Sequence, residues 1–286
     1  MTNLLSIRRF DAALGAEIVD LDLSKPLDGA IITAVKAAWD EHLVLLFRDQ
    51  KISDDDLIAF SRLFGNLDKP GVNPQGKPYH PTQPYINVIS NLKQDGVPLG
   101  NLGDGEAVWH ADMTYEDNPP VGAVLHGLAV PPAGGATYFA NMFAAYDALD
   151  AGTKALIDDK VAIHDGAHNS AGMLRRGYVE ETDVTKTPGA RHSLVRNFGG
   201  RKALFLGRRP HSYILGMAVP ESDALLDRIW AHASQDRFAF RHDWRVGDVL
   251  MWANQRVLHK RDAFDPNARR IMHRTQISER SEEIAA

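Results

Sequence analysis

Three residues in this chain have the types and spacing that could bind a catalytic metal. His110 and Asp112 lie two positions apart in Val108-Trp109-His110-Ala111-Asp112, and His259 follows an apolar, strand-like stretch far along the chain. Two histidines and one carboxylate on one face of a metal leave open positions opposite them, which suits Fe(II) sites that activate oxygen. Taken alone, a His-x-Asp tripeptide favours a plainer interpretation, in which the aspartate bonds its own backbone in a loop beside a half-buried histidine.

Two further residues could hold an organic acid at such a metal. Arg270 lies eleven residues after His259 on a strand-like segment, and a guanidinium can bind a carboxylate through two parallel hydrogen bonds. Gly134-Gly135-Ala136-Thr137 lets the chain turn into a strand, where the threonine hydroxyl can bond a carboxylate. Considered singly, the arginine fits a solvated strand surface and the glycine pair fits an ordinary hairpin.

Composition excludes several other kinds of chemistry. The 286 residues contain no cysteine, which rules out disulfides, thiolate nucleophiles, iron–sulfur clusters and thiolate zinc sites. Any metal must therefore bind histidine, aspartate or glutamate. The net charge of −5 and the pI of about 6.2 argue against non-specific binding to nucleic acid or to anionic membranes.

The pattern of apolar residues predicts a mainly β domain of the α+β class. Helical spacing is found at 28–39, at 54–63 with Ser53 as its cap, and at 143–149, 151–158 and 221–234. Short strands are expected at 17–23, 43–47, 86–90, 122–130, 137–141, 161–164, 193–196, 202–206, 238–242, 248–252, 257–260 and 270–277. Many short strands joined by Gly/Pro turns, without regular strand–helix alternation, favour a double-sheet jelly roll with peripheral helices.

No linker or repeat divides the sequence, so we expect a single domain over residues 1–286. The N-terminus lacks the order of regions that marks a signal peptide, and the chain has no run of eighteen apolar residues to span a membrane. We therefore expect a cytoplasmic protein. Segment 167–188 is long and poorly periodic, which is typical of an active-site lid or a disordered loop.

Taken together and in this order, the motifs resemble the taurine/2,4-dichlorophenoxyacetate dioxygenase family. Members of that family are Fe(II)- and 2-oxoglutarate-dependent enzymes built on a distorted double-stranded β-helix. The resemblance covers most of the chain. It rests on Trp-His-x-Asp, Gly-Gly-x-Thr, the distal histidine and Arg-Arg-x-x-x-Arg, and on the stretches LVLLFRDQ (43–50), FG (64–65), VPPAGG (130–135), GRKALF (200–205) and WRVGD (244–248).

The resemblance implies a role for each matching residue. His110, Asp112 and His259 would bind Fe(II), and Arg270, helped by Thr137, would pair with the distal carboxylate of 2-oxoglutarate. The expected cofactor is therefore Fe(II), and the expected co-substrates are 2-oxoglutarate and O2. Arg274, four residues after Arg270, would bind the anionic group of the substrate. Strand residues at i and i+4 face the same side of a sheet, so both arginines can serve one cavity.

The sequence departs from the family pattern where the substrate is chosen. Members that act on taurine carry a histidine and a tyrosine after the Phe-Gly pair, whereas this chain has Pro70 and Asn73 there, and Glu106 replaces an asparagine before the first ligand. These changes count against taurine and make Asn73 and Glu106 candidate substrate-binding residues. Arg209, which follows a strand that the family places beside the active site, is a further candidate, with a solvated loop charge as the alternative.

The resemblance implies hydroxylation of a small anionic substrate (a sulfonate, an aryloxyalkanoate or another carboxylate) with release of succinate and CO2. A hydroxylated carbon that bears a sulfonate or aryloxy group would lose it by C–S or C–O cleavage. Related halogenases lack the carboxylate ligand, so Asp112 favours hydroxylation.

The main alternative is a non-redox metal-binding jelly-roll enzyme or a ligand-binding module, which would have no need of Arg270 and Thr137 at this spacing. An oxygenase acting on nucleic acid or on protein side chains is disfavoured by the acidic pI. The family also suggests a homo-oligomer, either a dimer or a tetramer.

Overall fold

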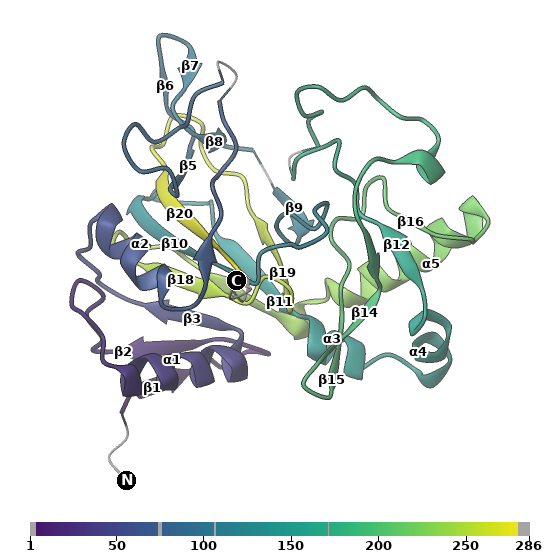
Figure 1. The fold of residues 1–286 in the computed structure, drawn as a ribbon, viewed down its shortest axis with the longest axis horizontal. Helices are drawn as coiled ribbons and strands as arrows, with labels where there is room; N and C mark the ends of the chain where they lie inside the picture. The colour runs from purple at the N-terminus through teal and green to yellow at the C-terminus, as the bar shows by residue number, and fades with distance from the viewer. Residues whose placement is uncertain (1–3, 74–75, 106, 171, 280–286) are drawn as a thin grey trace, which may run out of the picture.

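Two antiparallel-rich β-sheets dominate the computed structural model, which describes residues 4–73, 76–105, 107–170 and 172–279 (Figure 1). The larger sheet runs in the order β1 (Ser6–Arg9), β2 (Ala16–Val19), β3 (Val44–Phe47), β18 (Val249–Trp252), β10 (Gly122–Ala129), β20 (Ile271–Ser278), β5 (Asn87–Ser90), β8 (Asn101–Leu102), and β4 (Asn66–Leu67) also pairs with β20. The smaller sheet runs in the order β17 (Ala239–His242), β11 (Thr137–Asn141), β19 (Val257–Arg261), β9 (Ala107–His110).

The two sheets share one hydrophobic core. Phe139 on β11 and Trp252 on β18 are buried, and their ring centroids lie 5.6 Å apart. Phe47 on β3 extends the same core toward the helices, where its ring meets Phe60 of α2 (Asp54–Arg62) at 5.4 Å. Alternate residues of a strand point to opposite faces, so each sheet gives one face to this core. Polar side chains that enter it therefore need partners.

Helices α1 (Gly29–His42) and α2 lie against the larger sheet, with α1 packed on β3 and α2 packed on β10 and β20. Asp28 caps α1 by accepting from the Ile31 amide. Ser53 caps α2, and its reciprocal hydrogen bonds with Asp56 form a capping box that satisfies amides at the helix start. The three aspartates of the first turn, at 54–56, also stabilise this helix N-terminus through the helix dipole.

A smaller group of elements lies to the other side of β9 in Figure 1. It consists of β12 (Val161–Ile163), β13 (Arg191–Ser193) and β16 (Tyr213–Ile214) in one sheet, the hairpin of β14 (Val195–Phe198) and β15 (Arg201–Leu204), and helices α3 (Met142–Asp147), α4 (Ala151–Ile157) and α5 (Val219–Ala233). A hairpin of β6 (Lys93–Gln94) and β7 (Val97–Pro98) and 3₁₀ turns at Val184–Lys186 and Asp236–Phe238 complete the described elements. None of the helices described is long and apolar enough to cross a membrane.

The observed elements agree with the mainly β prediction, and all five predicted helices form with ends shifted by a few residues. Three differences matter. The strand expected at 193–196 is broken at Leu194, so that β13 and β14 join different sheets. Strands β1 and β16 were not anticipated. Neither was β9, which carries His110, because its four residues AVWH lack the alternating apolar pattern of a half-buried strand.

Asp248 ties three strands together at the edge of the core. Its carboxylate is fully buried and accepts from Arg48 Nη1 at 2.8 and 3.0 Å, from His242 Nε2 at 3.0 Å and from the Arg245 amide at 2.8 Å. Burial acts to raise the pKa of Asp248, but these hydrogen bonds and the nearby positive charge outweigh it, so the pKa lies below its ordinary value. The ionised form therefore stabilises the fold.

We expect Asp248→Asn to lower the free energy of unfolding by about 3 kcal/mol at neutral pH, because the half-buried Arg48 and the buried His242 lose their charged acceptor. A depressed folded-state pKa contributes stability that is complete above about pH 4 and is lost as the pH falls toward the folded value. The difference between wild type and variant should therefore shrink below about pH 4, as measured by urea unfolding at a series of pH values. Asp243→Asn, which removes an exposed pair with Arg241, is the control and should change little.

Candidate active site

The pairing of β9 with β19 brings the two candidate histidine ligands together. His110 and His259 are direct partners in the register of these strands, and their ring centroids lie 4.1 Å apart. Asp112 follows two residues after β9 and lies against both rings, with its carboxylate oxygens 3.7 Å from His110 Nε2 and 3.8 Å from His259 Nε2. All three side chains are buried. These ligand atoms are close enough together to hold one metal ion.

Hydrogen bonding and charge prepare the histidines for metal binding. His110 Nδ1 lies 2.7 Å from the carbonyl oxygen of Val108, which assigns the proton to Nδ1 and leaves the Nε2 lone pair directed at the centre of the triad. Burial and the adjacent His110 lower the pKa of His259 to about 3, so that its ring is neutral at pH 7. A neutral imidazole is the form that binds metal.

The carboxylate of Asp112 is ionised despite its burial. Burial acts to raise its pKa, but Arg274 and the two histidines hold it well below its usual range. Arg274 Nη1 donates to both oxygens, at 2.9 and 3.2 Å. An anionic ligand is thus available beside the two imidazoles.

Asn254 fixes the backbone around Asp112. The side chain of Asn254 is fully buried just after β18; its Oδ1 accepts from the Asp112 amide at 2.8 Å, and its Nδ2 donates to the carbonyl oxygens of Asp112 and Pro120, both at 2.9 Å. The Ala111 amide donates to the carbonyl oxygen of Gly207. The turn that carries the carboxylate is therefore held from two sides.

A pocket opens beside the triad between the two sheets. Its lining residues come from β5, β8, β9, β10, β11, β18, β19 and β20, and they are Ile89, Leu102, Ala107, His110, Leu125, Thr137, Trp252, His259, Arg261, Arg270 and Arg274. Apolar side chains thus make up about half of the wall, and three guanidinium groups and one hydroxyl supply most of its donors. Such a wall suits a small organic anion.

The structure places Arg270 and Thr137 in this pocket together. Arg270 is almost fully buried, its backbone amide donates to Asn91 Oδ1 at 3.0 Å, and its Nε has no hydrogen-bond partner among the described residues. Burial and the nearby Arg261 lower the pKa of Arg270 to about 9, which still leaves it charged at pH 7. Thr137 Oγ1 accepts from Trp244 Nε1 at 2.9 Å, which leaves the hydroxyl hydrogen available to donate to a ligand.

The remaining sequence-predicted residues lie apart from this pocket or outside the described chain. Asn73 bonds within its own turn, where its Oδ1 accepts from the Lys77 amide, and it does not line the pocket. Arg209 is paired with Asp223 and Asp227 on α5. Glu106 lies outside the described residues.

Two residues at the site were not singled out from the sequence. Asn254 acts through the backbone of a residue 142 positions away, so no local pattern indicates it. Arg261 is different, because it lies two residues after His259 and strand periodicity places both on one face. The alternation of side chains along a strand could therefore have indicated Arg261 from the sequence.

A second cluster of one aspartate and two histidines lies near α2. Asp54 accepts from His80 Nε2 at 3.0 Å and is 2.6 Å from His273 Nδ1. The Gln83 amide donates to His80 Nδ1 at 2.8 Å, which assigns the ring proton to Nε2, the atom that would have to offer a lone pair to a metal. These hydrogen bonds therefore favour a structural role for the cluster over metal binding.

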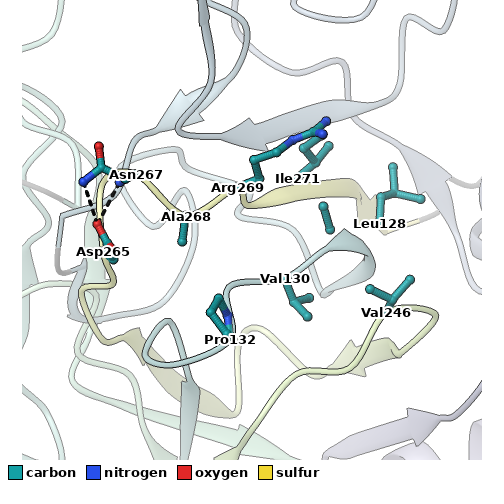
Figure 2. A pocket seen from close by; sticks show the side chains of 10 residues that line it. Leu128, Val130, Pro132, Val246, Asp265, Asn267, Ala268, Arg269 and Ile271 are labelled. Carbon is teal, nitrogen blue, oxygen red and sulfur yellow. Dashed lines mark hydrogen bonds between the residues drawn. The ribbon is translucent and has the colours of Figure 1, made fainter.

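A shallow hollow at the surface is separate from the buried pocket (Figure 2). Leu128, Val130, Pro132 and Val246 give it an apolar wall, and Asp265 on its rim is bonded to Asn267 within one turn. It contains none of the triad residues. Because it is open and lacks convergent polar groups, it does not compete with the pocket as the active site.

The residues present fit a divalent metal and a dianionic acid. A donor set of two imidazoles and one carboxylate is typical of the facial sites that bind non-haem Fe(II). The unpartnered Nε of the buried Arg270, together with the free hydroxyl hydrogen of Thr137, provides a receptor for a carboxylate in the same pocket.

We expect Asn254→Ala to lower the affinity for Fe(II) at least about tenfold, because Asp112 loses the group that fixes its backbone. Anaerobic titration calorimetry with Fe(II) would measure this affinity in the wild type and in the variant. Gln255→Ala is a matched control, since the Gln255 side chain bonds the carbonyl oxygen of Pro119 and not Asp112. Equal affinities in wild type and Asn254→Ala would show that the asparagine does not position the carboxylate.

Comparison with known proteins agrees with this geometry. The family model described as "Taurine catabolism dioxygenase TauD, TfdA family" matches residues 6–276. The chain is 34% identical to an (S)-phenoxypropionate/alpha-ketoglutarate-dioxygenase of Delftia acidovorans, over 99% of this chain and 98% of that protein. It is 34% identical to an alpha-ketoglutarate-dependent 2,4-dichlorophenoxyacetate dioxygenase of Cupriavidus pinatubonensis, with 91% and 92% covered.

A solved structure of AAD-2 in complex with Mn(II) and N-oxalylglycine superposes with a TM-score of 0.78 at 33% identity, and the match covers 98% of this chain and 99% of that chain. Both the sequence and the three-dimensional arrangement are therefore shared over essentially the full length. The chain belongs to the TauD/TfdA family of dioxygenases.

Proposed function

We propose that this protein, a 2-oxoglutarate-dependent dioxygenase, hydroxylates small carboxylate substrates, with aryloxyalkanoates as the favoured class. The observation that carries the proposal is the pocket in which an Asp-His-His triad and three buried arginines meet. The relatives that act on phenoxypropionate and 2,4-dichlorophenoxyacetate support the choice of substrate class, since they match nearly the whole chain.

In this proposal His110, Asp112 and His259 hold Fe(II), and Arg270 with Thr137 holds the distal carboxylate of 2-oxoglutarate. Fe(II) bound there supplies the redox chemistry that couples O2 and the decarboxylation of 2-oxoglutarate to succinate with hydroxylation of the substrate. The protein contributes a neutral His259, an ionised carboxylate and a guanidinium that remains charged at pH 7. The similar AAD-2 structure, which is a complex with Mn(II) and N-oxalylglycine, supports the binding of a metal and an organic acid.

Arg274 is the proposed receptor for the substrate carboxylate. It is buried on β20, it lines the pocket, and its guanidinium lies directly beside the triad through its contact with Asp112. A carboxylate bound to Arg274 would place the carbon next to it close to the metal. In an aryloxyalkanoate that carbon bears the aryloxy oxygen, and its hydroxylation leads to C–O cleavage.

We further propose that the two main sheets form the jelly roll of this family and that segment 167–188 serves as a lid. The pocket lining supports the first point, because it draws on strands of both sheets. Contacts support the second: Arg175 stacks over the Tyr115 ring at 3.8 Å, three residues beyond Asp112, and His168 Nε2 lies 3.2 Å from Glu180. The segment therefore packs on the turn that follows the carboxylate ligand.

We expect anaerobic addition of 2-oxoglutarate to the Fe(II)-loaded protein to produce the weak visible charge-transfer band of the chelate. Asp112→Ala should lose the band because a metal ligand is removed, and Arg270→Ala should require a much higher 2-oxoglutarate concentration. Glu41→Ala, which removes an exposed ion pair with Arg9, is the control. Iron-loaded wild type without a band would refute the proposed function and favour a metalloprotein without redox chemistry.

Arg274→Gln should raise KM for a phenoxyalkanoate at least about thirtyfold while changing the affinity for 2-oxoglutarate only a few-fold, since a charge-assisted hydrogen-bonded pair is worth roughly 2 kcal/mol or more. Succinate release with varied substrate and direct 2-oxoglutarate titration would separate the two effects. An unchanged KM would place the substrate carboxylate elsewhere.

A further inference from the structure

Arg261 is a buried arginine of the pocket wall with unused hydrogen-bond donors. Its side chain is 6% exposed, and neither Nε nor Nη1 has a partner among the described residues. Nη2 is used, because it donates to the carbonyl oxygens of Leu102 and Gly105. A buried guanidinium with two unsatisfied N–H-bearing nitrogens is costly, so its retention needs an explanation.

Strand geometry directs Arg261 to the same part of the pocket as the proposed 2-oxoglutarate-binding residues. Arg261 lies two residues after His259 on β19 and therefore on the same face of the strand. In the register of β11 and β19 its direct partner is Thr137. All three residues line the pocket.

Arg261 and Arg270 also lie on one aromatic ring. The guanidinium carbon of Arg261 is 5.5 Å from the centroid of the Phe264 ring, and that of Arg270 is 5.9 Å from the same centroid. Two cations in one buried pocket repel one another unless anions offset their charge: in addition to burial, Arg261 lowers the pKa of Arg270 in this way, and the Asp104 carboxylate acts on the pKa of Arg261 in the opposite sense. Arg274, the third guanidinium of the pocket, has Asp112 as its partner.

We propose that Arg261 is a second arginine for 2-oxoglutarate: its Nε and Nη1 bind the distal carboxylate together with Arg270 and Thr137, while Nη2 holds the 102–105 segment against the pocket. This inference rests on the proposed function. A carboxylate has two oxygens and about four acceptor positions, so it can accept from two guanidinium groups and a hydroxyl at once. The arrangement would favour dicarboxylic over monocarboxylic 2-oxo acids.

The test compares two co-substrates that differ only in the distal carboxylate. Binding of 2-oxoglutarate and of 2-oxovalerate, its five-carbon analogue with one carboxylate, is measured by anaerobic calorimetry on metal-loaded wild type, Arg261→Gln and Arg261→Lys. Arg261→Gln should weaken 2-oxoglutarate binding about 10- to 100-fold, as expected for lost hydrogen bonds to a charged group. It should leave 2-oxovalerate binding within about twofold of wild type. Arg261→Lys keeps the positive charge, so its affinity for 2-oxoglutarate should lie between those of wild type and Arg261→Gln.

Lys260→Gln is the matched control. Lys260 is the preceding residue on β19, and its ammonium lies over the Trp109 and Tyr138 rings. Because Lys260 does not line the pocket, the variant removes one positive charge without removing a hydrogen-bond donor from the pocket wall. It should bind both acids as wild type does.

Three results would overturn the inference. If Arg261→Gln weakens both acids equally, Arg261 acts only by supporting the 102–105 segment. Unchanged 2-oxoglutarate affinity in both Arg261 variants would show that the distal carboxylate does not contact this residue. Failure of wild type itself to bind 2-oxoglutarate would refute the proposed function, and the inference would fall with it. Should Arg261→Gln not fold, the ratio of the two affinities in Arg261→Lys decides the question.

Discussion

The site depends on the pairing of two short strands. β9 and β19 meet at the edge of the smaller sheet with His110 directly opposite His259, and this register sets the distance between the two imidazoles. A shift by one residue would turn every side chain of β9 to the other face of the sheet. Hydrogen bonds from neighbouring elements protect that register, including the contact between the Ala111 amide and Gly207.

Burial of charge is the second constraint. The pocket wall carries three guanidinium groups, one of which contacts the buried Asp112 carboxylate, and ions taken out of water are stabilised only by partners at close range. Asp112 and Arg274 neutralise one another, which leaves Arg261 and Arg270 as the positive part of the cavity. Such a surplus of positive charge favours the binding of an anion, and the proposed pairing of two arginines with one carboxylate is consistent with it.

Two buried polar residues that do not line the pocket, Asn254 and Asp248, are also stabilised by close partners. Asn254 and Asp248 are fully buried, and each satisfies its polar atoms with several partners from other segments. Asn254 joins the end of β18 to the turn of Asp112, and Asp248 joins β18 to β3 and β17. Both flank β18, the strand that brings Trp252 beneath His259 with ring centroids 5.2 Å apart. Hydrogen bonds at both ends of β18 therefore hold this strand in place, and those of Asn254 also hold the turn that carries Asp112.

Local sequence patterns were enough to predict the mainly β composition, the five helices and the candidate metal-binding residues. Helix caps such as Ser53 and apolar alternation such as that of 137–141 are local signals, and His110, Asp112, His259 and Arg270 were indicated by residue type and spacing. The triad residues do come together, as their types suggest they should.

Contacts between distant segments exclude some of the sequence-predicted residues from the pocket and bring others to it. Arg209 pairs with α5 and Asn73 bonds its own turn, whereas Arg261 and Asn254 lie at the site. The strand β9 forms although its sequence lacks a strand pattern, because pairing with β19 satisfies its backbone. Local sequence determines what a side chain can do. Where that side chain lies depends on contacts between segments more than a hundred residues apart, and no local pattern encodes them.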